Sequence, residues 1–179
     1  IGNQINEINE RSNALKKINK KNYLKLISKH HSIPVNDKNI LDFLEFIPQS
    51  GFILDVGGAW GYHWRNLYKI RPDITLFIID IVRENLKISK EILSHQINKN
   101  IYLIHGDGQS LPFEDNTFNG YWNVQTLQHV PKIEQAICEA KRVLIVNGVF
   151  FHYQFNYNHI SHKLFKIFGR KYKLNQKFH

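Results

Sequence analysis

Two acidic residues that each follow an apolar run are the residues of this chain best suited to bind a ligand. Residues 53–56 (Ile-Leu-Asp-Val) carry Asp55 and lead directly into a glycine-rich segment, and a second apolar run, residues 75–79, ends at Asp80. A strand, a tight turn and the start of a helix allow backbone N–H groups to approach a ligand closely. Carboxylates at the ends of two such strands indicate a nucleoside-type ligand, because they can accept hydrogen bonds from its hydroxyl groups.

The spacing of the glycines argues against a dinucleotide-binding loop. That loop follows G-x-G-x-x-G, which, counted from Gly57, would require glycine at Ala59 and Tyr62. An alternative is a tight turn that binds no ligand. Ala59 is expected to be tolerated if its φ stays negative, and its methyl group narrows the space beside the turn.

Further along the chain, several segments follow in an order that resembles the class I S-adenosylmethionine-dependent methyltransferases. The resemblance covers roughly residues 53–153, and the pattern is similar to that of the small-molecule methyltransferases of quinone biosynthesis. The family's usual first motif is an acid followed by G-x-G-x-G. Gly57 and Gly61 match this motif, and Ala59 replaces its middle glycine. Within the segment that resembles the family's "RVLKPGG" turn, Ile145, Val146 and Asn147 replace Lys-Pro-Gly, so this turn is expected to differ. The segments that carry the resemblance are Asp55–Gly61, His105–Phe113, Glu114–Phe118, Asn123–Val130 and Ala140–Phe150.

The resemblance implies S-adenosylmethionine as cofactor. It assigns the ribose hydroxyls to Asp80 and the adenine amino group to Asp107, with Asp55 and the carbonyl of Asn123 toward the ligand's ammonium group. Asp80 could instead cap the following helix, and Asp107 could form an ordinary Asp-Gly turn. The full expected cofactor site is Asp55, Gly57, Gly58, Ala59, Gly61, Asp80, Ile81, Asp107, Gly108 and Asn123.

A catalytic residue is harder to assign, because methyl transfer from a sulfonium mainly requires alignment and exclusion of water. His129 could serve as a base near the acceptor, although a helix-capping role is the simpler interpretation. Cys138 lies in a helical apolar pattern and is expected to be a small core residue. No Cys/His cluster resembles a zinc site, so no metal is expected.

Strands and helices alternate from Phe52 onward, which predicts a Rossmann-like, doubly wound, mostly parallel sheet. By resemblance, its strand order is 3-2-1-4-5. Residues 1–50 are expected to form an N-terminal helical cap, in which Pro34 breaks the pattern, and residues 51–179 the cofactor-binding domain. Helices are expected over about 83–97 and from Pro131 onward, the latter with the apolar stripe Ile133, Ala136, Ile137, Ala140, Val143 and Leu144.

The charge of the chain lies at its ends. The formal net charge is +9, and residues 151–179 hold six Lys/Arg and no acid. Basic ends can steer toward phosphate, nucleic acid or anionic lipid, but a solvated helix face is the simpler explanation. No transmembrane segment or secretory leader is visible, so a cytoplasmic location is expected. The last strands of the complete fold are expected to be absent. The apolar face of a helix expected near 159–168 would then be buried by a partner chain, or be exposed and make the chain prone to self-association.

These patterns lead to three hypotheses. The first is an S-adenosylmethionine-dependent methyltransferase, a transferase acting on a small organic or lipid-like acceptor. The second is a non-catalytic cofactor-fold module or inactive copy, which Ala59 and the altered turn favour. The third is an RNA-modifying methyltransferase. Only the basic ends favour a nucleic-acid partner, so a small molecule is the expected one.

Overall fold

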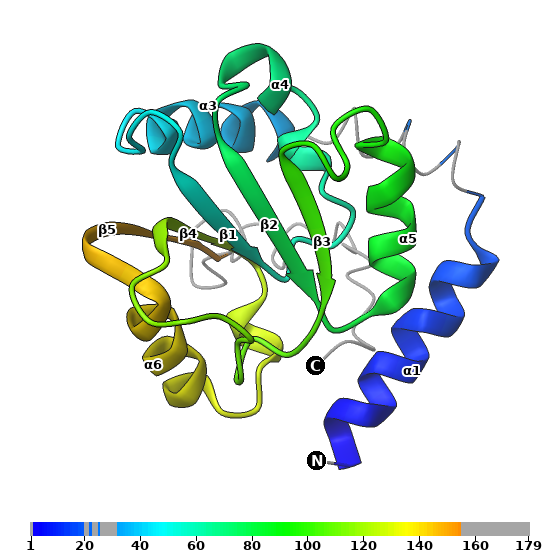
Figure 1. Cartoon of the computed structure of the whole chain (residues 1–179). Helices are drawn as coiled ribbons and strands as arrows, with labels where there is room; N and C mark the ends of the chain where they lie inside the picture. The colour runs from blue at the N-terminus through cyan, green and yellow to red at the C-terminus, as the bar shows by residue number, and fades with distance from the viewer. Residues whose placement is uncertain (1, 20–21, 23–24, 26–31, 155–179) are drawn as a thin grey trace, which may run out of the picture.

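The strands of this protein form one parallel sheet with helices on both faces (Figure 1). The computed structural model describes residues 2–19, 22, 25 and 32–154. The elements are α1 (Gly2–Lys17), α3 (Ser32–Leu44), β1 (Phe52–Val56), the 3-10 helix η1 (Tyr62–Trp64), α4 (Leu67–Ile70), β2 (Thr75–Asp80), α5 (Arg83–Ile92), β3 (Ile101–His105), β4 (Phe118–Val124), the 3-10 helix η2 (Leu127–His129), α6 (Ile133–Val143) and β5 (Leu144–Tyr153).

The strand order is β3-β2-β1-β4-β5, which confirms the predicted order. β1 lies at the centre of the sheet, where Leu54 pairs with Phe77 of β2 on one side and with Tyr121 of β4 on the other. Its residues are buried on both faces from Ile53 to Val56. A central parallel strand covered on both faces requires such a nearly continuous apolar run, and this is why the acid at position 55 is conspicuous in the sequence.

Two apolar cores hold the layers together. On one face, α3, η1 and α5 pack on the sheet, and Trp64 lies edge to face with Trp122 at 5.5 Å between ring centroids. Trp122 also stacks on Phe151 of β5 at 4.1 Å. Each aromatic pair of this kind is worth about 0.5–1.5 kcal/mol beyond its buried area. On the other face, α6 covers the sheet through Ala140 and Val143.

Two helix boundaries differ from the expectation. α3 begins at Ser32, so Pro34 lies in its first turn and does not break the helix. A proline is tolerated there because the first N–H groups of a helix have no intrahelical partner. α5 ends at Ile92, five residues before the predicted end. The chain then turns, and Ile97 forms an isolated bridge with Ile101.

The predicted apolar stripe of α6 is only partly buried. Ala136, Ala140 and Val143 lie in the core, whereas Ile137 is 47% exposed and Ile133 is also exposed. The expectation that Cys138 is a core residue is wrong, because Cys138 is exposed. The helix packs on the sheet through its small residues, and a residue two positions from Ala136 or Ala140 projects from a different side of a 3.6-residue helix.

The residues expected to form an altered Lys-Pro-Gly turn, Ile145, Val146 and Asn147, lie within β5. β5 begins at Leu144, directly after α6, and Asn147 has a φ of 64°. The pairing of β4 with β5 shifts register between Phe118 and Gly120, which accommodates the extra residues. The predicted helix near 159–168 lies outside the described residues. Within the part of the chain that the structure describes, no helix is long and apolar enough to cross a membrane.

Candidate cofactor site

A cavity of about 460 Å³ opens at the carboxyl ends of β1, β2 and β4. Ligands in open parallel sheets bind at this edge, where the strand order reverses, and the volume lies within the range of small-molecule sites. The predicted site residues that line it are Gly57, Ala59, Asp80, Ile81, Asp107 and Gly108. Ile8 and Arg11 of α1 and Gln125, Thr126 and His129 after β4 complete much of the wall.

The turn after β1 contains three residues with a positive φ angle, Gly57, Ala59 and Gly61, and one of them is not a glycine. Gly57 has a φ of 73°, and a Cβ there would lie 2.2 Å from the side chain of Thr126. Ala59 also has a positive φ, of 47°, so the condition under which alanine was expected to be tolerated is not met. An L-residue in this region costs roughly 1–2 kcal/mol. The family's glycine at this position therefore has a direct conformational reason.

Asp80 connects the turn to the helix that follows β2. Its Oδ2 accepts the Ala59 N–H at 3.0 Å, and its Oδ1 accepts the Val82 N–H at 2.8 Å and an N–H of Asn85 at 3.2 Å. The side chain is 6% exposed and lines the cavity. Burial raises the pKa of Asp80, and the hydrogen bonds that it accepts oppose this shift. The Asp80 carboxylate can therefore hold the turn and contact a ligand in the cavity at the same time.

Asp107 lies across the cavity, after β3. Its Oδ1 accepts the Gln109 N–H at 2.9 Å, and its backbone carbonyl accepts the Ser110 N–H at 3.1 Å. Asp107 therefore forms the Asp-Gly turn, and the same residue also lines the cavity.

Asp55 and Asn123 are buried beside the turn and are not part of the cavity wall. Asp55 is 1% exposed and accepts the Trp64 indole N–H at 2.7 Å. The pKa of Asp55 is raised to about 7. Burial is the largest cause, the charge of Asp80 also raises the pKa, and the hydrogen bond from Trp64 opposes them. Gly58 and Gly61 are buried too, and a Cβ at Gly58 would lie 2.5 Å from Asp55 Oδ2.

Asn123 holds the end of β1 in place. Its amide donates to the Val56 carbonyl at 2.9 Å, and its Oδ1 lies 3.0 Å from His152 Nδ1. Both ends of the amide are therefore occupied within the protein. Its assignment to a ligand ammonium stays a prediction, and the geometry favours an indirect part in shaping the turn.

The histidines near the site differ in environment. His129 lies at the end of η2 and lines the cavity, with Nε2 at 3.0 Å from Gln128 Nε2. His63 in η1 lies outside the cavity lining, and burial together with the charge of Arg65 lowers its pKa to about 4. Among the residues that the structure describes, no group of three or more His, Cys, Asp or Glu side chains is placed to hold a metal ion.

Three residues of the cavity wall, Arg11, Thr126 and Asn85, were not predicted from the sequence, and only Asn85 carries a signal that could have indicated it. Arg11 comes from a helix far from the motifs, and Thr126 is recognisable only through its contact with Gly57. Asn85 links Asp80 to the Trp60 indole, whose N–H donates to Asn85 Oδ1 at 3.1 Å. It lies five residues after Asp80, in the first half of α5, and this spacing is the one signal that could have indicated it.

A parallel sheet of this order, with a glycine turn after β1 and acids after β2 and β3, defines the class I S-adenosylmethionine-dependent methyltransferase fold. The sequence pattern of the methyltransferase domain family matches residues 54–152, more than half of the chain. The chain therefore belongs to this family.

Relatives and solved structures agree with this assignment. A ubiquinone/menaquinone biosynthesis C-methyltransferase of Methylobacterium nodulans is 30% identical over 59% of this chain and 42% of its own length. A demethylmenaquinone methyltransferase of Staphylococcus haemolyticus is 34% identical over 56% of this chain and 39% of its own. The chain thus spans less than half the length of these relatives. A candidate S-adenosyl-L-methionine-dependent methyltransferase from Methanococcus maripaludis shares the fold, with a TM-score of 0.63 and 23% identity over 85% of this chain and 74% of its own.

Proposed function

We propose that this protein takes part in methyl transfer from S-adenosylmethionine to a small organic or lipid-like acceptor. The observation that carries the proposal is the cavity itself, where Gly57, Asp80 and Asp107 line the same space although they lie far apart in sequence. The donor and acceptor chemistry of this wall suits an adenosine group with two hydroxyls and an exocyclic amine.

The residues of the wall would divide the ligand between them. Asp80 accepts hydrogen bonds from the ribose hydroxyls, and Asp107 accepts one from the adenine amino group. The turn from Gly57 to Gly61 adjoins the methionine part. Asp55 and Asn123 act indirectly, because Asp55 accepts the Trp64 indole N–H and Asn123 donates to the Val56 carbonyl at the end of β1. S-adenosylmethionine supplies a methyl group already activated on a sulfonium, so the protein's task is alignment and exclusion of water.

The acceptor belongs at the open side of the cavity, near the segment that follows β4. His129 lines the cavity after β4, which supports a role in taking a proton from an acceptor that must lose one. The names of the relatives, a quinone-biosynthesis C-methyltransferase and a demethylmenaquinone methyltransferase, support an aromatic carbon of a hydroquinone as the methylated atom.

A panel of acceptors tests the proposal. The protein is incubated with methyl-labelled S-adenosylmethionine and, in separate reactions, a prenylated hydroquinone, a simple phenol, a small amine and RNA. Label in the hydroquinone supports the proposal. Cofactor binding without transfer to any acceptor would favour the non-catalytic module instead, and label in RNA alone would favour the RNA-modifying enzyme.

A further inference from the structure

Among the residues that the structure describes, Gln109 supplies the hydrogen bonds to the Asp107 carboxylate. The side-chain Nε2 of Gln109 lies 3.0 Å from Asp107 Oδ1 and 2.9 Å from Oδ2, and the Gln109 backbone N–H donates to Oδ1 at 2.9 Å. Gln109 is 8% exposed, so these hydrogen bonds are largely shielded from water. Because both oxygens are bound by the same amide, the plane of the carboxylate is fixed.

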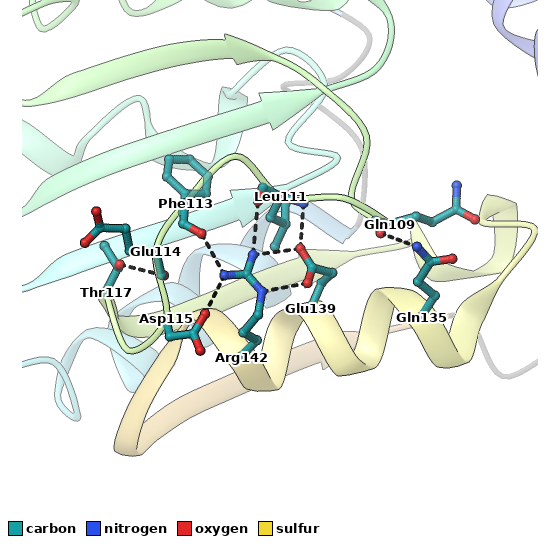
Figure 2. Close-up of polar contacts among 9 residues, drawn as sticks. All are labelled: Gln109, Leu111, Phe113, Glu114, Asp115, Thr117, Gln135, Glu139 and Arg142. Carbon is teal, nitrogen blue, oxygen red and sulfur yellow. Dashed lines mark hydrogen bonds and ion pairs between the residues drawn. The ribbon is translucent and has the colours of Figure 1, made fainter.

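Two residues at the start of α6 contact Gln109, one at its side-chain amide and the other at its backbone. Its Oε1 accepts the Lys132 N–H at 3.1 Å, and its backbone carbonyl accepts an N–H of Gln135 at 2.9 Å, as Figure 2 shows for the second contact. The Lys132 N–H can only donate, so it requires the oxygen end of the Gln109 amide. The amino end must then face Asp107.

A second set of contacts holds the rest of the loop against α6. Figure 2 shows Arg142 at the centre of this set, with hydrogen bonds to the carbonyls of Leu111 at 3.0 Å and Phe113 at 2.7 Å. Glu139 binds the Arg142 guanidinium in a bidentate fashion, at 2.7 and 2.8 Å, and accepts the Leu111 N–H at 2.7 Å. The loop that carries Asp107 and Gln109 is therefore braced at several points.

We propose that Gln109 is a positioning residue that orients the Asp107 carboxylate so that it accepts a hydrogen bond from an exocyclic amine of the ligand. The proposal rests on the proposed function, because it assumes that an adenosine group occupies the cavity. A carboxylate has about four acceptor sites, and Gln109 fills three of them. Asp107 lines the cavity, so the remaining site is available to a ligand that donates. A ligand with a keto group in place of the amine presents a second acceptor and is rejected.

Isosteric replacement of Gln109 tests this role through binding alone. The affinities of wild type and Gln109→Glu are measured for S-adenosylhomocysteine and for S-inosylhomocysteine, which carries the keto group. Wild type is expected to favour the amine form. Gln109→Glu is expected to bind it at least about tenfold more weakly at neutral pH, because two carboxylates now face each other. Its affinity should recover as the pH falls below neutrality, since a shared proton restores the donor.

A matched control separates positioning from general support of the loop. Gln135→Ala removes a contact to the Gln109 backbone and should leave both the preference for the amine and its pH dependence unchanged. Unaltered affinity, preference and pH dependence in Gln109→Glu would overturn the proposal while the proposed function stands. Failure of wild type to bind either compound would overturn both. If Gln109→Glu does not fold, Gln109→Met, which lacks donor and charge, should lose the preference without gaining pH dependence.

Discussion

Replacing Ala59 by glycine should stabilise this protein, although glycine usually destabilises. Ala59 has a φ of 47°, and this conformation costs an L-residue roughly 1–2 kcal/mol. Both backbone groups of the residue are engaged, the N–H with Asp80 Oδ2 at 3.0 Å and the carbonyl with the Ser89 hydroxyl at 2.7 Å. Ala59→Gly keeps both hydrogen bonds and removes only the strain.

The expected gain is the strain minus the extra freedom of glycine in the unfolded chain. That freedom amounts to roughly 0.5–1 kcal/mol, so the net stabilisation of Ala59→Gly lies between about 0 and 1.5 kcal/mol, with a central value of about 0.8 kcal/mol. For a chain of this size, 1 kcal/mol corresponds to a rise in Tm of about 2–4 °C. Urea and thermal unfolding, followed by circular dichroism, measure both quantities.

The matched control is Ala14→Gly, at an exposed position within α1. In a helix interior the same substitution costs about 1 kcal/mol, so the two variants should shift stability in opposite directions. A loss of stability in Ala59→Gly equal to that in Ala14→Gly would refute the positive φ at Ala59. It would also refute the conformational explanation of the family's glycine.

Two further predictions concern buried and braced charges. Burial raises the pKa of Asp55 from 3.8 to about 7, so the folded state retains a proton that the unfolded state loses, and stability falls as pH rises between these two values. Asp55→Asn can still accept the Trp64 indole N–H and cannot ionise. Its stability relative to wild type should therefore increase with pH across this range in urea titrations, and a constant difference would contradict the assignment. Arg142→Ala leaves two loop carbonyls and Glu139 without their donor and should cost about 1–3 kcal/mol. Arg142→Lys should restore little of this, because an ammonium cannot reproduce the bidentate geometry; full restoration would show that charge alone suffices.

Sequence reasoning predicted the sheet because its strands are apolar runs that end in polar residues. The run that precedes Asp55 and the run that precedes Asp80 could be identified without knowledge of the partners, since a central parallel strand is buried on both faces. The order of the strands came from the resemblance to the methyltransferase family, and the structure confirms it.

The features that the sequence did not predict depend on contacts between distant segments. The positive φ of Ala59 follows from hydrogen bonds to Asp80 and Ser89, twenty or more residues away. The exposure of Cys138 depends on which side of α6 meets the sheet, and a helical apolar pattern alone leaves two sides possible. Arg11 reaches the cavity only because α1 packs beside α5 (Figure 1).

The central claim is that the cavity binds S-adenosylmethionine or its demethylated product, and calorimetry with S-adenosylhomocysteine tests it most directly. Wild type should bind one equivalent, and NAD should bind more weakly or not at all. Asp80→Asn, which keeps one acceptor oxygen for the turn, should bind about ten- to a hundredfold more weakly, corresponding to the roughly 1.5–3 kcal/mol of a hydrogen bond to a charged group. Binding of NAD as tight as that of S-adenosylhomocysteine, or unchanged affinity in a folded Asp80→Asn, would contradict the account.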